Sequence, residues 1–311
     1  MQQRTLISVP AQAWRSEWGL RYDAPMQADK GHLKTWISQV LALLLLGGAI
    51  FFALKQVDLF ALREASLINL AGLGAAVIAN VVLTGLLFWV ITRSFEAKPG
   101  VRLGPMVMLI AWSGLLNYVP LVRPGLWGRA AYLKNHHQLP IRQSLMILAV
   151  VLGLTLVVLG SVSVAMLLLP DPIRIPVILV GGAMLTWGTK PIAQMLLAQP
   201  MVLAWAWVPL RLADLLVTVG RLMLAFDVMG HPIDSTTALV AASASLLIKL
   251  VGLTPNGLGL SAWVVGLVAS AMGDVTPAMG VAAGLIDRAV EVLVMIPLGL
   301  LSAWRLSGKS R

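Results

Sequence analysis

Nine ionisable side chains lie inside or beside long apolar stretches of this sequence, where charged residues are otherwise rare. They are Arg123, Arg129, Arg211, Asp214, Arg221, Lys249, Asp287, Arg288 and Glu291. An ionised group at the centre of a bilayer costs at least about 2.5–3.5 kcal/mol, so such residues persist where they form ion pairs or line a polar path. The chemistry on offer is therefore either ion pairing that locks helices together or recognition of a charged ligand.

The spacing of these residues is helical. One face of segment 201–226 carries Trp207, Arg211, Asp214, Thr218 and Arg221, at intervals of 4, 3, 4 and 3 residues. Two interpretations stay open for Arg211–Asp214 and Arg288–Glu291, namely simple ion pairs or members of a ligand site. The nine residues comprise six cations and three carboxylates, a surplus of three positive charges. Because Arg forms bidentate hydrogen bonds to phosphate, the surplus predicts an anionic lipid headgroup or a lipid-linked phosphate as ligand.

The amino-acid composition indicates which class of protein contains these charged side chains. Of 311 residues, 59% are hydrophobic and 12% are charged, and the mean hydropathy is +0.87. A soluble domain carries roughly 25% charged residues, so a soluble enzyme, a fibrous chain and a disordered chain are excluded. The net charge of +10 lies mostly in tails and loops, which argues for positive-inside orientation and against nucleic-acid binding.

Catalytic and metal-binding patterns are sparse. The chain has no cysteine, which excludes disulfides, thiol catalysis and cysteine zinc sites. No nucleophile-elbow, HExxH or phosphate-binding-loop motif occurs, and the adjacent His136 and His137 point about 100° apart on a helix. We expect no cofactor and no metal, and a transporter is favoured over an enzyme.

Apolar segments long enough to cross a bilayer alternate with two shorter apolar runs. The segments are 36–54, 67–92, 103–119, 144–169, 173–189, 201–226, 236–254 and 277–304, and the runs are 121–133 and 260–272. Each run would form roughly 20 Å of helix, too short for a hydrocarbon core of about 30 Å. Proline and glycine precede or open both runs, at Pro120, Gly125, Pro255, Gly257 and Gly259.

These breaks predict that 103–133 and 236–272 are re-entrant hairpins, since non-helical backbone at membrane depth needs protein or water around it. The fold class expected is an all-α polytopic membrane protein with about six full transmembrane helices and two re-entrant hairpins. One hairpin would enter from each side, as in an inverted-topology repeat; the alternative is that proline and glycine merely kink two long helices.

The same threading predicts the organisation of the chain and its location. Residues 1–35 form a cytoplasmic tail, 36–304 the transmembrane domain and 305–311 a second cytoplasmic tail. Both termini and the basic loops then lie on one side, as expected for a multi-pass protein of a bacterial inner membrane.

The stretch from Leu116 to Leu133, which reads LNYVPLVRPGLWGRAAYL, resembles a signature of the flippase-like family, which includes the transmembrane domain of lysylphosphatidylglycerol synthases. The later PNGLG at 255–259 and AAGLIDR at 282–288 are similar to further elements of that family. The matching residues are Asn117, Pro120, Arg123, Gly125, Arg129, Pro255, Gly257, Gly259 and Arg288. The resemblance implies lipid translocation or envelope-lipid biosynthesis, without the aminoacyl transfer of the synthases' soluble domain.

The sequence departs from this family at two places. Ser261 to Trp263 stand where an acidic residue often follows the late glycines, and 148–159 is wholly apolar where the family often has charged residues. These departures leave open a different substrate or no transport at all.

From these patterns we expect a protein that flips an anionic or phosphate-bearing membrane lipid. The expected substrate-binding residues are Arg123, Arg129, Arg211, Arg288, Lys249 and Asn117, and the expected supporting acids are Asp214, Asp287 and Glu291. Two alternatives are a non-catalytic membrane partner of a lipid-synthesis enzyme and a membrane enzyme acting on a lipid-linked phosphate. Partners expected besides the lipids are a lipid-synthesis enzyme or further copies of the chain.

Overall fold

The computed structural model describes residues 66–95, 100–118, 124–169, 204–251 and 254–307, with isolated positions at 44–51 and 173–188. Within these ranges the chain is helical and contains no β-strand. The all-α part of the predicted fold class is thereby confirmed for the described residues. The 1–35 tail, most of the 36–54 segment, part of 173–189 and residues 308–311 lie outside them.

Four long helices form the frame of the molecule. They are α3 (Leu67–Phe95), α6 (Ile141–Leu168), α8 (Trp207–Val228) and α11 (Pro277–Ser307). α3 and α6 are almost purely apolar, and each contains a stretch long and apolar enough to cross a bilayer, at Leu67–Ser94 and Ile141–Ala165. α8 and α11 are also at least 22 residues long, but each carries several charged residues in its apolar sequence.

Short helices occur in two pairs, each at a predicted hairpin. The first pair is α4 (Leu103–Leu116) and α5 (Pro124–His137). The second pair is α9 (Ser235–Val251) and α10 (Leu260–Met272), with the 3-10 turn η3 (Pro255–Gly257) between them. The members of each pair pack against one another. The helices are therefore interrupted where proline and glycine predict it, and both pairs turn back on themselves.

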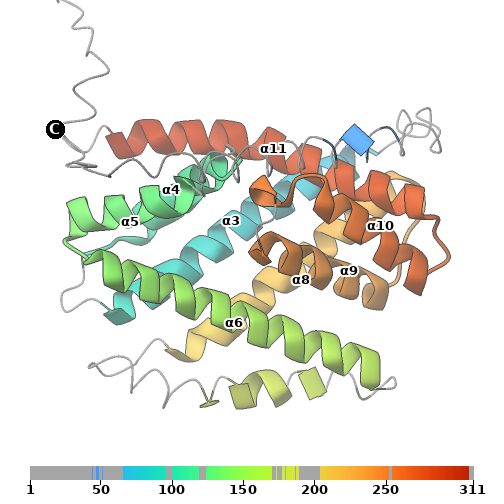
Figure 1. The fold of residues 1–311 in the computed structure, drawn as a ribbon, viewed down its shortest axis with the longest axis horizontal. Helices are drawn as coiled ribbons and strands as arrows, with labels where there is room; N and C mark the ends of the chain where they lie inside the picture. The colour runs from blue at the N-terminus through green and yellow to red at the C-terminus, as the bar shows by residue number, and fades with distance from the viewer. Residues whose placement is uncertain are drawn as a thin grey trace, which may run out of the picture.

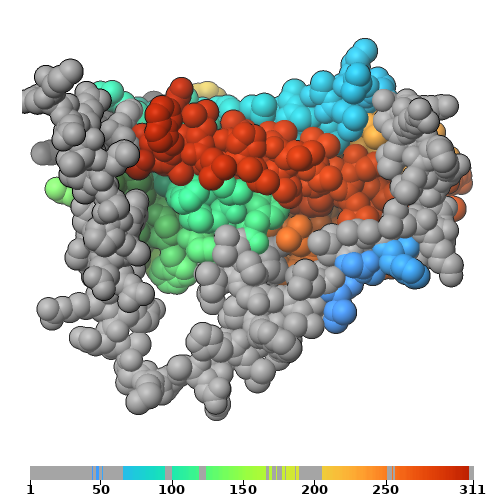
Figure 2. Space-filling model, turned by 90° about the horizontal axis from the view of Figure 1, so that it is seen from above, coloured from blue at the N-terminus to red at the C-terminus, as the bar shows by residue number. Residues whose placement is uncertain are grey.

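The long helices enclose the middle of the molecule, and the short pairs lie at its two ends. In Figure 1, α3 and α8 lie side by side through the centre, α11 and α6 lie along opposite edges, and the pairs α4–α5 and α9–α10 lie at opposite ends. Figure 2 shows α11 extending across one face with α4 beside it. This arrangement brings the ends of α4 and α9 to the central helices, where the polar residues lie.

Apolar side chains form both the core and much of the outer surface. One buried cluster joins α3, α4, α6, α8 and α9, with fully buried Leu73, Ile91, Leu159 and Phe226 among its members. Large apolar side chains are exposed on the outer faces of α6 and α11. They are Leu156, Val157, Val164 and Leu168 on α6, and Leu293, Ile296, Leu300, Leu301 and Trp304 on α11. Such continuous apolar faces are typical of helices that contact lipid or another apolar partner.

Candidate functional site

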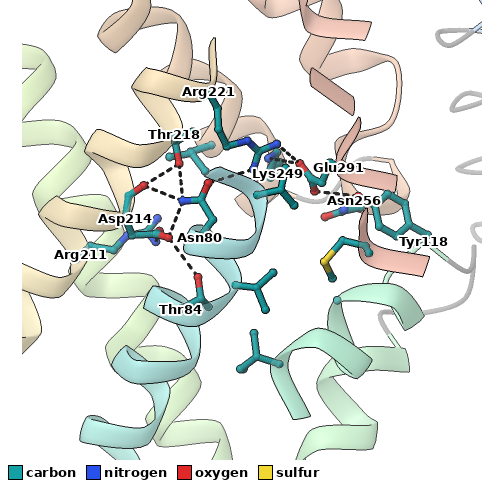
Figure 3. Close-up of a pocket in the computed structure, with 16 residues that line it drawn as sticks. Asn80, Thr84, Tyr118, Arg211, Asp214, Thr218, Arg221, Lys249, Asn256 and Glu291 are labelled. Carbon is teal, nitrogen blue, oxygen red and sulfur yellow. Dashed lines mark hydrogen bonds and ion pairs between the residues drawn. The ribbon is translucent and has the colours of Figure 1, made fainter. Parts of the chain in front are cut away.

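A cavity of about 220 Å³ lies where α3, α8 and α11 meet the ends of α4 and α9. Its polar lining is drawn in Figure 3 and consists of Asn80, Thr84, Tyr118, Arg211, Asp214, Thr218, Arg221, Lys249, Asn256 and Glu291. The remaining lining is aliphatic, apart from Gly114 and Met295. The cavity is therefore a polar, ionised space inside an otherwise apolar bundle.

The first part of its polar network is centred on Asp214 of α8. Asp214 forms a buried ion pair with Arg211, one turn earlier on the same helix. From α3, the Asn80 Nδ2 donates to Asp214 Oδ1 at 2.9 Å and the Thr84 hydroxyl donates to it at 3.3 Å. The Nδ2 of Asn80 also lies 3.2 Å from Thr218 Oγ1. The predicted helical face of α8 is thus directed at α3.

The second part is centred on Glu291 and Asp287 of α11. Arg221 of α8 donates from Nε to Asp287 Oδ1 at 3.0 Å and from Nη2 to Glu291 Oε2 at 2.8 Å. Arg288, one turn before Glu291, donates from Nη1 to the same Oε2 at 3.0 Å. Both guanidinium groups are almost fully buried, so the carboxylates of α11 supply the compensation that ionised arginines need away from water.

Asn80 connects the two parts of the network. Its Nδ2 donates to Asp214, and its Oδ1 accepts a hydrogen bond from Arg221 Nη1 at 3.1 Å. One amide side chain therefore satisfies an acidic group on one side and a basic group on the other. Truncation of Asn80 would leave buried partners of both signs without a hydrogen bond.

Both interrupted hairpins reach Glu291. Tyr118, just after α4, donates its hydroxyl proton to Glu291 Oε1 at 2.8 Å. Lys249, in the last turn of α9, places Nζ 3.8 Å from Glu291 Oε2. Asn256 of η3 hydrogen-bonds Tyr118, so the ends of the two hairpins also contact each other. The carboxylate in the middle of α11 is thus a common anchor for the two hairpin tips.

The turn between α9 and α10, at 255–259, has a backbone conformation that only certain residues adopt readily. Asn256, Gly257 and Gly259 have φ values of 48°, 73° and 74°, in the left-handed region. Asparagine and glycine are the residues that tolerate this conformation best. A Cβ on Gly257 would also lie 3.1 Å from Lys249 Cγ. The PNGLG sequence therefore shapes the backbone that positions Lys249 and Asn256 at the cavity.

A smaller cavity of about 20 Å³ lies behind the first, between α8, α9, α10 and α11. Its polar lining is Thr218, Ser245, Lys249, Ser261, Asp287 and Arg288. The hydroxyl of Ser261 is buried and has no hydrogen-bond partner among the described residues. A cavity of this size holds about one water molecule, which would satisfy that hydroxyl.

The charges of the described site nearly balance. Arg211, Arg221, Lys249 and Arg288 face the carboxylates Asp214, Asp287 and Glu291. Four cations against three carboxylates leave a surplus of one positive charge, smaller than the surplus of three expected from the sequence. The difference arises because Arg123 lies outside the described residues and Arg129 lies elsewhere. The helix-locking ion pairs Arg211–Asp214 and Arg288–Glu291 are both present.

Several residues expected at the site do not line the cavity. Arg129 of α5 is buried with its guanidinium 3.9 Å from the centre of the Phe88 ring, and no carboxylate pairs with it among the described residues. The Asn117 side chain is directed at the start of α5, where a Cβ on Gly125 would lie 2.5 Å from its Oδ1. Pro120 and Arg123 fall in 119–123, outside the described residues.

Six polar cavity residues were not among the expected substrate-binding or supporting residues. They are Asn80, Thr84, Tyr118, Thr218, Arg221 and Asn256. The sequence does hold a signal for Asn80, which is a polar residue in the middle of an apolar helix and stands one turn before Thr84. Arg221 was recognised as a charge within an apolar segment, but its central position between α3 and α11 follows only from the fold.

Among the described residues, no group of three His, Asp or Glu side chains is arranged to hold a metal ion. No protein-family model, no curated protein and no solved structure matches the chain. The function must therefore be argued from the cavity itself.

Proposed function

We propose that the chain is a polytopic membrane protein that moves a lipid with an anionic, phosphate-bearing headgroup across a bacterial cytoplasmic membrane. The observation that carries the proposal is the cationic cavity at the meeting point of two interrupted helical hairpins, within a bundle whose outer helix faces are apolar. Interrupted helices that meet at mid-bilayer are a recurring way to build a transport site.

The charge of the cavity favours a single negative charge on the ligand. Every carboxylate of the network is paired with an arginine, and one cation is in excess. A phosphodiester brings one negative charge and neutralises that excess, whereas a second buried negative charge would be left without compensation. The Nε of Arg211 is buried without a hydrogen-bond partner among the described residues and is a donor available to phosphate oxygens.

The neutral lining suits the rest of a polar headgroup. The side chains of Asn80, Thr84, Tyr118 and Asn256 carry amide and hydroxyl groups at the cavity wall. These groups exchange hydrogen bonds with hydroxyl groups such as those of glycerol or a sugar. The acyl chains would stay in the bilayer, against the exposed apolar side chains of α6 and α11.

The test is lipid flipping in proteoliposomes that contain fluorescent phosphatidylglycerol or fluorescent phosphatidylcholine, followed by dithionite quenching. We expect faster loss of the protected phosphatidylglycerol pool with the protein than in empty liposomes. In Lys249→Met the surplus charge is lost while the side-chain stem is retained. The preference for phosphatidylglycerol should then fall about tenfold, because a hydrogen bond to a charged group contributes about 1.5–3 kcal/mol.

Lys134→Met is the matched control, since Lys134 is exposed on α5 and lies outside the cavity. It should leave the lipid preference unchanged. No flipping of either lipid by a folded, reconstituted protein would overturn transport of these lipids and turn attention to a partner role in lipid synthesis. Equal flipping of both lipids by the unaltered protein would overturn the anionic-headgroup assignment.

A further inference from the structure

The described helices fall into two series with the same order of long and short helices. Residues 67–168 form a long helix, two short helices and a long helix, and residues 207–307 do the same. The starts of corresponding helices are 132–140 residues apart: Leu67 and Trp207, Leu103 and Ser235, Pro124 and Leu260, Ile141 and Pro277. The similar separations indicate that α3 corresponds to α8, α4 to α9, α5 to α10 and α6 to α11.

The packing of the helices obeys the same correspondence. α3 packs on α4 and α6, as α8 packs on α9 and α11. α5 packs on α4 and α6, as α10 packs on α9 and α11. Between the two series, α4 packs on α11 as α9 packs on α6, and α3 packs on α11 as α8 packs on α6. Exchanging the two series therefore leaves the set of helix contacts unchanged. This is the result expected if a two-fold rotation relates one series to the other.

The relative direction of α3 and α8 determines how the two-fold axis is oriented. A Cβ on Gly72 of α3 would lie 3.5 Å from Leu224 of α8, and Thr84 Oγ1 lies 3.3 Å from Asp214 Oδ1. A later residue of α3 thus contacts an earlier residue of α8, so the two helices are antiparallel. An axis that relates antiparallel helices runs across them, and Figure 1 is viewed nearly along it.

The axis passes through the cavity. Asn80 and Thr218 are 138 residues apart, within the 132–140 residues that separate corresponding helix starts, and they lie within hydrogen-bond distance at 3.2 Å. Two corresponding residues on antiparallel helices touch only where the axis passes between the two helices. The polar network around Asn80 is therefore the centre of the repeat.

We infer that the chain consists of two inverted structural repeats, and that the cavity on their axis opens in turn to each side of the membrane. In inverted-repeat transporters, such alternation arises because one repeat rocks against the other around a central site. Here the C-terminal ends of α4 and α9, at Tyr118 and Lys249, would be the two gates, and Glu291, which both side chains approach, would be their shared contact. This inference concerns the access to the site and rests on the transport function proposed above.

The absence of cysteine makes the inference testable with single introduced thiols. Two pairs of exposed loop positions correspond across the repeats: Gly100 with Pro232, and Gln138 with Asp274. Each would be changed to cysteine singly and labelled with a membrane-impermeant maleimide in sealed vesicles of each orientation. We expect the two members of each pair to react from opposite sides. Reaction of both members from the same side would overturn the inverted repeat.

Access to the cavity is tested by Val81→Cys, a lining position of α3, with Leu215→Cys in the core of α8 as control. We expect the thiol at position 81 to react from either side and the thiol at 215 from neither. Reaction at 81 from one side only would overturn alternating access, even if the loop pairs behave as expected. Access from both sides without flipping of either fluorescent lipid would instead count against the proposed lipid, so the two failures are distinguishable.

Discussion

At the scale of single residues, Asn80 joins the acidic and basic parts of the cavity network. Its amide group binds Asp214 and Thr218 through Nδ2 and Arg221 through Oδ1. Asn80→Ala should lower the stability by about 2–4 kcal/mol, because it leaves two buried charged groups each short of a hydrogen bond. Unfolding in detergent, followed by the loss of helical circular dichroism, measures this effect.

Asn117 supplies the matched control for that measurement. It is also half-buried, but its Oδ1 has no hydrogen-bond partner among the described residues. Asn117→Ala should therefore cost less than Asn80→Ala. Equal costs for the two substitutions would show that the Asn80 network contributes no more than ordinary packing.

Sequence reasoning found the charged residues of the site better than the neutral ones. A charge inside an apolar segment is conspicuous at any position, so Arg211, Lys249 and Glu291 could be singled out from the sequence. Tyr118 and Asn256 could not, because a tyrosine or asparagine near a helix end is ordinary until the opposing helix is known. The position of Arg129 against Phe88 also depends on how α5 packs on α3, which no local pattern encodes.

At the scale of elements, the second hairpin depends on its left-handed turn. Gly257→Ala should destabilise the tip by about 1–2 kcal/mol, since φ is 73° and the added Cβ would press on Lys249 at 3.1 Å. Because Lys249 lines the cavity, the flipping rate should fall as well. Thermal unfolding and the dithionite assay check the two effects.

Gly220→Ala is the control for the loss of a glycine. Gly220 lies inside α8, and a Cβ there would meet nothing within 4 Å. That substitution should be neutral or stabilising by up to about 1 kcal/mol, as expected for alanine in a helix interior. If Gly257→Ala were as stable and as active as Gly220→Ala, the role assigned to the left-handed turn would be contradicted.

Helix interruptions were predictable from the sequence, whereas helix bounds were less so. Proline and glycine marked both hairpins, because neither residue continues a helix without cost. The structure begins α6 at Ile141 instead of 144 and α8 at Trp207 instead of 201, and it extends α5 to His137. Hydropathy alone misses these ends, because polar residues such as Arg142 and Lys134 also continue a helix.

At the scale of the whole molecule, the exposed apolar faces predict how the protein fractionates. Side chains such as Leu168, Leu293 and Trp304 are at least 70% exposed. The chain should stay in the membrane pellet after an alkaline carbonate wash and should be extracted by detergent. Release by carbonate alone would contradict a spanning arrangement. The control is a second protein that is known to span the membrane. It should stay in the pellet under the same carbonate wash.

The division of charge between the two series of helices has a consequence for how such a protein can diversify. Every ionised side chain of the network belongs to 207–307, whereas 67–168 contributes Asn80, Thr84 and Tyr118, which are neutral. One half thus holds the ionic framework while the other offers adaptable wall positions such as Val77 and Ile110. Substitutions at those positions change the shape of the cavity without disturbing its balance of charge, so selectivity for the ligand proposed above and stability can evolve separately.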